Sequence, residues 1–342
     1  MTGLPENMDA AVLISREVIE LQRRPVPRPA PDEVLVRVGA VGICGSDVHF
    51  WHEGALGDWV VDGPLVLGHE SAGRIVAVGR DVPPDRIGER VSIEPQRPEA
   101  WSREVLEGRY NLDPGMRFYA TPGVDGAFAE YVTIPSRFAW HVPDEVSDEA
   151  AALLEPLSVA IATARKAGIT VGHRVLIAGA GPIGVAIAQV ARVHGAVEVL
   201  VSDIDAARRE QVLTFGATAA LRPDEVVASL AVDAFVDASG AAHAVAAGIR
   251  AVRPAGRVVL VGMGAAEMPL PVSVIQNREL EVTGVFRYAN TWPTAIGLVA
   301  SGAVDLDRMV TGHYPLDRVE DALASTRRPG VMKSVVHPDG RS

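Results

Sequence analysis

The sequence contains very little cysteine: Cys44 is the only one in 342 residues. A single cysteine excludes an intrachain disulfide and favours a reducing, cytoplasmic setting. Positive charge is also scarce, because 32 Lys and Arg residues stand against 43 Asp and Glu residues, for a formal net charge of −11. This balance argues against nucleic acids and anionic membranes as partners.

Long apolar runs are missing as well. A membrane span needs about 18 consecutive apolar residues, and glycines, Pro182 and Gln189 interrupt the longest run. The first residues, MTGLPENMDA, have neither a basic start nor an apolar core, so no signal peptide is expected. The chain is long enough for two domains with separate cores. We therefore expect a two-domain globular protein of the cytoplasm.

The most informative stretch runs from residue 175 to residue 203 and reads VLIAGAGPIGVAIAQVARVHGAVEVLVSD. An apolar strand, a G-x-G-x-x-G turn, a helix and a second strand follow one another, and an acidic residue comes last. Such glycines permit a tight turn and a close approach of the backbone to a pyrophosphate, which the helix N-terminus attracts. The order of elements predicts a dinucleotide site. Its expected residues are Gly179, Gly181, Pro182, Ile183, Gly184, Asp203 and Arg208.

Asp203 indicates which dinucleotide is used. A carboxylate at this strand end accepts hydrogen bonds from the adenosine ribose and repels a 2′-phosphate, which favours NAD over NADP. Arg208 and Arg209 are the counter-evidence, because either could reach a phosphate or simply cover the adenine.

The two parts of the chain have different patterns. Short strands and glycine turns fill the first part: a hairpin at 10–24, a proline-rich connector at 25–31, and strands at 33–38, 73–78, 90–93 and 126–134, with a glycine-bounded turn at 39–49 and a loop at 54–67. A helical segment at 147–166 leads to six strands that alternate with helices, at 173–178, 197–202, 218–221, 232–238, 256–261 and 280–286. This second part predicts a doubly wound parallel sheet. Two helices, at 291–301 and 317–327, and a strand at 331–336 are expected to return to the first domain and leave a cleft between the two.

Four residues could hold a metal: Cys44, His69, Glu70 and Glu155. Zinc favours thiolate, imidazole and carboxylate ligands, and a catalytic zinc keeps one position for substrate. Taken alone, each residue also has an ordinary interpretation, since a lone cysteine is usually a small buried hydrophobe. No C-x-x-C or H-E-x-x-H spacing is present, so the spacing alone does not establish a metal site.

Longer motifs give the resemblance to a family. The stretches GICGSDVHFWHEGALGDWVVDGPLVLGHE, ALLEPLSVAI and VLIAGAGPIG, in this order, resemble the zinc-dependent medium-chain alcohol dehydrogenases. EGRYNLDP, FYATPGVDGAFAEY and GVFRYANTWP are similar to the polyol dehydrogenase branch, of the sorbitol, xylitol and L-iditol type. The resemblance covers essentially the whole chain. It implies an α/β protein with a GroES-like, mainly β catalytic domain (1–152 and 288–342) and a Rossmann cofactor domain (153–287).

The resemblance also implies roles for individual residues. Cys44 and His69 would bind one catalytic zinc directly, and Glu70 would be a ligand or a neighbour of the metal. Glu155 would hold the zinc-bound water or bind the zinc itself. Proton transfer to solvent would use Ser46 and His49. The residues expected around the substrate are Phe118, Thr121, Arg287 and Tyr288.

One departure from the family concerns a second zinc. Many relatives hold a structural zinc with four cysteines ahead of the RYNL segment, and the matching positions here are Glu99, Ser102, Val105 and Asp113. None is cysteine, so we expect no structural zinc in the lobe formed by residues 95–122. The expected cofactors are one catalytic zinc and NAD.

The resemblance implies the reversible oxidation of a polyol secondary alcohol to a ketose, and it implies a homotetramer. The same chemistry on a cyclitol, an amino-cyclitol, a sugar or threonine stays open. A zinc-free quinone or enoyl reductase and a non-catalytic NAD-binding protein are the further alternatives. Cys44 together with His69 and Glu70 argues against the reductase. The intact metal ligands and proton-transfer residues argue against the non-catalytic protein.

Overall fold

The computed structural model describes residues 4–340, and the chain forms two compact units. The first comprises residues 1–155 and 292–342, and the second comprises residues 156–291. Residues 1–3 of the stretch in which no signal peptide is expected lie outside the described residues. No helix in the described part of the chain is both long and apolar enough to cross a membrane.

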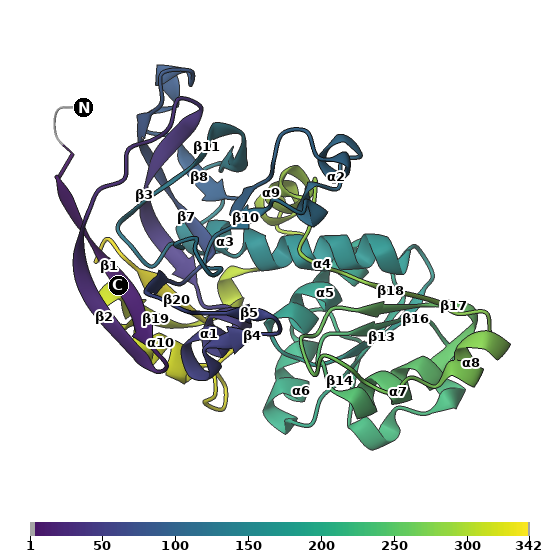
Figure 1. Ribbon diagram of the computed structural model, residues 1–342. Coiled ribbons are helices and arrows are strands. Elements are labelled where there is room, and N and C mark those ends of the chain that lie inside the picture. Colours follow the sequence, from purple (N-terminus) through teal and green to yellow (C-terminus); the bar gives the residue numbers. More distant parts are fainter. Residues whose placement is uncertain (1–3, 341–342) are drawn as a thin grey trace. The chain divides into compact units, whose positions relative to one another are not determined.

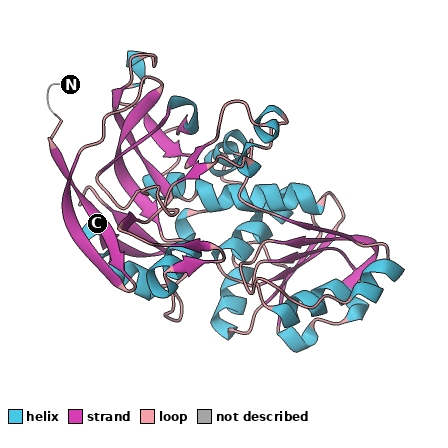
Figure 2. Ribbon diagram, viewed as in Figure 1, coloured by secondary structure: helices cyan, strands magenta, loops and turns pink. Residues whose placement is uncertain are grey.

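The first unit consists mainly of β-strands (Figure 2). Its strands are β1 (Asn7–Ser15), β2 (Val18–Pro25), β3 (Glu33–Gly42), β4 (Ala55–Leu56), β5 (Trp59–Val60), β6 (Leu65–Val66), β7 (Glu70–Val78), β8 (Arg90–Ile93), β9 (Gln96–Arg97), β10 (Arg117–Phe118), β11 (Tyr131–Pro135), β12 (Ala139–His141), β19 (Val310–Pro315) and β20 (Lys333–His337). Its helices are α1 (Gly45–Glu53), α2 (Arg103–Leu106), α3 (Asp148–Ala152), α9 (Trp292–Ala300) and α10 (Val319–Ser325).

Strand β3 is the centre of the larger sheet in this unit. The sheet has the order β12-β8-β7-β3-β20-β19, and β11 also pairs with β3. The sequence EVLVRVGAVG buries nearly every side chain, because β3 has neighbours on both edges and apolar residues on both faces. The strand stops at Gly42, two residues before Cys44. This buried strand therefore presents the candidate metal ligand.

The second unit is a six-stranded parallel sheet with helices on both faces (Figure 1). The strand order is β15-β14-β13-β16-β17-β18, so the strands that follow β13 are added first on one side of it, up to β15, and then on the other side, from β16 onwards. Sheets of this kind bind ligands at the point where the order changes sides. The strands are β13 (Arg174–Ala178), β14 (Glu198–Ser202), β15 (Ala219–Leu221), β16 (Val232–Asp237), β17 (Val252–Leu260) and β18 (Glu281–Gly284). The helices are α4 (Leu154–Ala167), α5 (Pro182–Val193), α6 (Ala206–Leu213), α7 (Ala242–Ala251) and α8 (Val272–Asn277). The predicted doubly wound sheet is confirmed.

Three local predictions are wrong in the first unit. The segment 126–134 becomes a regular strand only at Tyr131, because Gly126 lies against the backbone of residues 67–68, where a Cβ would be 2.3 Å from the Gly68 carbonyl. The turn predicted at 39–49 gives way to helix α1 at Gly45, and the predicted loop 54–67 contains the short strands β4, β5 and β6. Strand β19 was not predicted, since its sequence VTGHYP contains a glycine and ends in a proline, residues that are typical of turns.

Candidate metal and cofactor sites

Cys44, His69 and Glu70 come together although they lie on different segments. Cys44 follows β3 and precedes α1, whereas Glu70 is the first residue of β7 and His69 directly precedes it. One ligand atom from each lies within 4.8 Å of the other two. The imidazole and the carboxylate are buried, with 6% and 1% exposure, and Cys44 is half-buried. This set of thiol, imidazole and carboxylate fits the donor chemistry that zinc prefers.

Asp47 positions this group and was not singled out in the sequence. Its buried carboxylate accepts hydrogen bonds from the backbone N–H of Cys44, at 3.0 Å, and of Gly68, at 2.9 Å. One side chain thus ties together the two segments that carry Cys44 and His69. Its position three residues after Cys44, in the first turn of α1, is the signal that could have identified it.

The electrostatics of the group favour a bound cation. Burial alone would lower the pKa of His69, but the charges of Cys44 and Asp47 outweigh burial and hold that pKa well above its usual range. Asp47 Oδ1 lies 3.7 Å from His69 Nδ1. The same negative surroundings that hold a proton on the imidazole would attract a metal ion.

Lys333 is a second residue that the sequence did not reveal. Its ammonium lies 2.6 Å from the Glu70 carboxylate and donates to the Ile43 carbonyl at 2.7 Å. Both side chains are almost fully buried, with 4% and 1% exposure. Burial lowers the pKa of Lys333, but the charge and hydrogen bond of Glu70, together with the charges of Cys44 and Glu155, outweigh burial and the pKa is raised. Because 263 residues separate the partners, no local pattern indicates the pair.

Replacement of Lys333 by methionine is expected to destabilise the first unit by about 3 to 5 kcal/mol, because it leaves the Glu70 charge buried without its partner. Urea unfolding measures the change. The double variant Glu70→Gln/Lys333→Met is the matched control, and it should recover most of the loss because both charges are gone. A Lys333→Met protein as stable as the wild type would show that Glu70 is not left as an uncompensated buried charge.

Glu155 lies in the first turn of α4 and is buried, with 5% exposure. It is not part of the group formed by Cys44, His69 and Glu70 in the described residues. The neighbouring charge of Glu155 acts on Glu94, a buried carboxyl that the sequence analysis did not identify. Burial raises the pKa of Glu94 to about 7, hydrogen bonds from Tyr110 and Trp140 oppose the rise, and the Glu155 charge adds to it.

Glu94 should make stability depend on pH. Its pKa is 4.5 without burial and about 7 in the folded chain. Because the folded-state value is raised, the stabilisation is complete below pH 4.5 and is lost as pH rises through 7, by about 3 kcal/mol in all. Glu94→Gln keeps an uncharged side chain, so its stability relative to the wild type should increase between pH 5 and pH 8. A difference between the two proteins that is the same at both pH values would contradict this linkage.

The structure also positions the predicted proton-transfer and substrate residues of the first unit. Ser46 and His49 lie three residues apart on α1, and His49 Nδ1 is 2.9 Å from the Glu53 carboxylate. Phe118 is buried beside His69, with 5.5 Å between ring centroids. Thr121 donates its hydroxyl to the Phe118 carbonyl at 2.7 Å. Phe118 therefore lies next to the candidate metal group, as a residue that lines the substrate position would.

Arg287 and Tyr288 belong to the second unit. The Arg287 guanidinium lies 4.7 Å above the centre of the Phe286 ring, and its backbone has a φ of 55°. Tyr288 is buried, with 1% exposure. Their contact with a substrate stays a prediction.

The glycine-rich turn has the geometry that its sequence predicts. Gly179 follows β13 with a φ of 100°, and Gly181 is the N-cap of α5, whose first residue is Pro182. Gly184 packs so closely that a Cβ would lie 1.9 Å from the Gly179 carbonyl. Ile183 lies beside it in the first turn of the helix. The free N–H groups at this helix start are positioned for a pyrophosphate.

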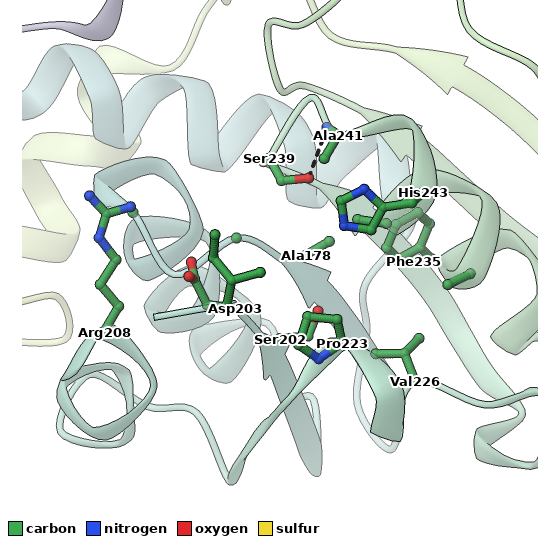
Figure 3. A pocket seen from close by; sticks show the side chains of 15 residues that line it. Ala178, Ser202, Asp203, Arg208, Pro223, Val226, Phe235, Ser239, Ala241 and His243 are labelled. Atoms are coloured by element: carbon green, nitrogen blue, oxygen red, sulfur yellow. Dashed lines mark hydrogen bonds between the residues drawn. The ribbon is translucent and has the colours of Figure 1, made fainter. Parts of the chain in front are cut away.

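A pocket of about 250 Å³ lies beside the glycine-rich turn that follows β13. Figure 3 shows Asp203 and Arg208 on one side of this pocket and Phe235 and His243 on the other. Asp203 accepts hydrogen bonds from the backbone N–H of Ala180, at 2.7 Å, and of Asp205, at 2.9 Å. These bonds fix the carboxylate at the pocket and leave it further lone pairs for hydroxyl groups.

Arg208 and Arg209 differ in their surroundings. Arg208 lines the pocket. The Arg209 guanidinium donates to the carbonyls of Asp203 and Ile204, at 2.8 and 2.9 Å. Of the two, Arg208 is therefore the residue placed to meet a nucleotide. Ser239 and His243 also line the pocket. Neither could be identified from the sequence, because they follow a strand without a recognised motif.

Comparison with known proteins assigns the chain to one family. Residues 30–144 match the model of the alcohol dehydrogenase GroES-like domain, and residues 182–301 match that of the zinc-binding dehydrogenases. The chain belongs to the zinc-binding medium-chain alcohol dehydrogenases, in the polyol dehydrogenase branch. It is an alcohol or polyol oxidoreductase that uses a nicotinamide cofactor.

Relatives and solved structures cover nearly the whole chain. Sorbitol dehydrogenase of Gallus gallus is 39% identical over 94% of each chain, and that of Bacillus subtilis (strain 168) is 38% identical over 98% of this chain and 99% of its own. A Sinorhizobium meliloti 1021 structure, described as a zinc-binding dehydrogenase bound to NADP, has a TM-score of 0.91 and 32% identity over 98% of this chain and 100% of that one. L-idonate 5-dehydrogenase of Escherichia coli K-12 has a TM-score of 0.91 and 27% identity, over 97% and 98%.

Proposed function

We propose that this chain uses one zinc ion at Cys44 and His69, together with NAD, to oxidise a secondary hydroxyl group of a linear polyol reversibly to a ketone. The observation that carries the proposal is the buried group of Cys44, His69 and Glu70, because its donor atoms fit zinc. The sorbitol dehydrogenases among its relatives support a polyol as the substrate.

The zinc would act as a Lewis acid that lowers the pKa of the substrate hydroxyl, and NAD would accept the hydride. Cys44 and His69 would hold the ion. Glu70 is engaged by Lys333, so we propose that it balances charge beside the metal. Glu155 would orient water next to the same group. Either glutamate would contact the zinc directly or through a water molecule.

The remaining steps belong to residues of this chain. Ser46 and His49 would carry the hydroxyl proton towards solvent, where the Glu53 carboxylate lies 2.9 Å from His49 Nδ1. Asp203 would bind the adenosine ribose of NAD and exclude a 2′-phosphate. Polar groups, with Arg287 among them, would bind the vicinal hydroxyls, since a substrate without those hydroxyls would leave them unpaired. We also propose that the protein is a homotetramer and that it is located in the cytoplasm.

Initial rates of NADH formation across a substrate panel test the proposed substrate class. The panel contains sorbitol, xylitol, other pentitols and hexitols, a cyclitol, a sugar acid, threonine and a simple secondary alcohol. We expect the highest kcat/KM on linear polyols. Turnover confined to the cyclitol, the sugar acid or threonine would keep the chemistry and overturn the polyol assignment.

A further inference from the structure

A second group of possible metal ligands lies in the first unit, on elements that do not carry Cys44, His69 or Glu70. Glu149 comes from α3, His313 from β19 and His337 from the end of β20. Their ligand atoms all lie within 4.8 Å of one another. Glu149 Oε1 is 2.8 Å from His313 Nδ1 and 3.1 Å from His337 Nε2, and the two imidazoles stack with 5.8 Å between their centroids. One carboxylate oxygen thus faces two imidazole nitrogens.

The orientation of His337 is the main evidence for a ligand. Its Nδ1 lies 3.2 Å from the Gly39 carbonyl. A carbonyl can only accept, so Nδ1 carries the proton, and in the neutral ring Nε2 then presents its lone pair. Nε2 is buried and makes no hydrogen bond within the described residues, although Glu149 Oε1 is so near. Two lone pairs facing each other repel unless a proton or a metal ion lies between them.

Metal-binding histidines usually have this arrangement: one ring N–H donates to a backbone carbonyl and fixes the ring, while the other nitrogen binds the ion. Ligands of a tetrahedral zinc lie about 3.3 Å apart. The observed distances of 2.8 and 3.1 Å need only a small widening to admit the ion.

We propose that Glu149, His313 and His337 form a second metal site, for a divalent transition metal such as zinc. Two imidazoles and one carboxylate select zinc-type ions over Mg²⁺ and Ca²⁺, which prefer oxygen ligands. The side chains of His313 and Glu149 are 50% and 23% exposed, so ions can enter and water can complete the coordination. The neighbouring Asp148 is paired with Arg90 at 2.7 Å and leaves Glu149 to the two histidines.

This second site would be structural. It would give two zinc ions per chain, whereas the sequence predicts one. It would join α3, which leads into the helix that carries Glu155, to β20, which carries Lys333. It lies outside the lobe at 95–122, where four cysteines are missing, and it does not depend on the reaction proposed for the Cys44 group.

Zinc content tests the proposal directly. The full chain is stripped of metal with a chelator, dialysed against low micromolar ZnCl₂, and analysed for zinc per chain by mass spectrometry. We expect two zinc ions in the wild type and one in His313→Gln, which can still donate a hydrogen bond to Glu149 but removes an imidazole ligand. His141→Ala, which removes an exposed histidine of the same unit, should keep two.

Two further results separate this site from the Cys44 group. Cys44→Ala should retain one zinc ion, and added zinc should raise the Tm of Cys44→Ala but leave that of Cys44→Ala/His313→Gln unchanged. Equal zinc content in the wild type and His313→Gln would overturn the second site. If only the Cys44 group fails to bind, the wild type would hold one ion, Cys44→Ala would still hold one, and His313→Gln would hold none.

Discussion

Replacement of Cys44 by alanine is expected to lower kcat for polyol oxidation by at least about 10³-fold. The variant loses a thiolate from the candidate zinc group, and Lewis-acid stabilisation is worth several kcal/mol, where about 4 kcal/mol corresponds to about 10³-fold in rate. The nucleotide pocket is formed by residues of the second unit alone. NADH binding, measured by fluorescence titration, should therefore keep its wild-type Kd.

The retained NADH affinity is the control for folding in this experiment, because an unfolded protein would lose both properties. Zinc content of the same sample links the loss of rate to the metal. A Cys44→Ala enzyme that turns over at the wild-type rate would remove Cys44 from the catalytic machinery and with it the zinc mechanism.

Replacement of Asp203 by serine is expected to shift the preference for NAD over NADP by about 10² in the ratio of kcat/KM values. A hydrogen bond to a charged group contributes about 1.5 to 3 kcal/mol, and its loss weakens NAD binding. At the same time NADP gains, because the carboxylate that repels its 2′-phosphate is gone. Initial rates with each cofactor at a fixed substrate concentration give the ratio.

Asp205→Ser is the matched control for this change. Asp205 is the N-cap of α6 and accepts from the N–H groups of Ala207 and Arg208, a role that serine also fills. It removes the same charge two residues away, and Asp205 does not line the pocket within the described residues. The control should leave the ratio unchanged. If Asp203→Ser also leaves it unchanged, Arg208 becomes the residue to vary next.

The fold of the second unit could be predicted almost completely from the sequence. Its strands β13, β14 and β16 are mostly apolar runs separated by helices, and the glycine turn at Gly179 follows the first of them. The first unit was harder, because its pairing is long-range: β3 pairs with β20, almost 300 residues later. A segment such as 126–134 is shaped by the backbone it lies against, which periodicity does not show.

The same distinction holds for the sites. Residues in local motifs, such as Cys44, His69 and Asp203, were identified and lie in the candidate sites. Residues that act through distant partners were missed. Lys333 neutralises Glu70 across the sheet, and Glu94 is perturbed by burial and by Glu155. Neither lies in a spacing that indicates its role, because burial and charge pairing arise only when the chain folds.

The dependence of polyol turnover on zinc tests the central claim most directly. The enzyme is stripped of metal with a chelator, assayed for NADH formation with sorbitol or xylitol, and assayed again after ZnCl₂ is added in steps. We predict that the rate falls to background without metal and returns as the Cys44 group fills, while His313→Gln regains its rate with one zinc ion per chain. Full turnover in the metal-free enzyme would contradict the account.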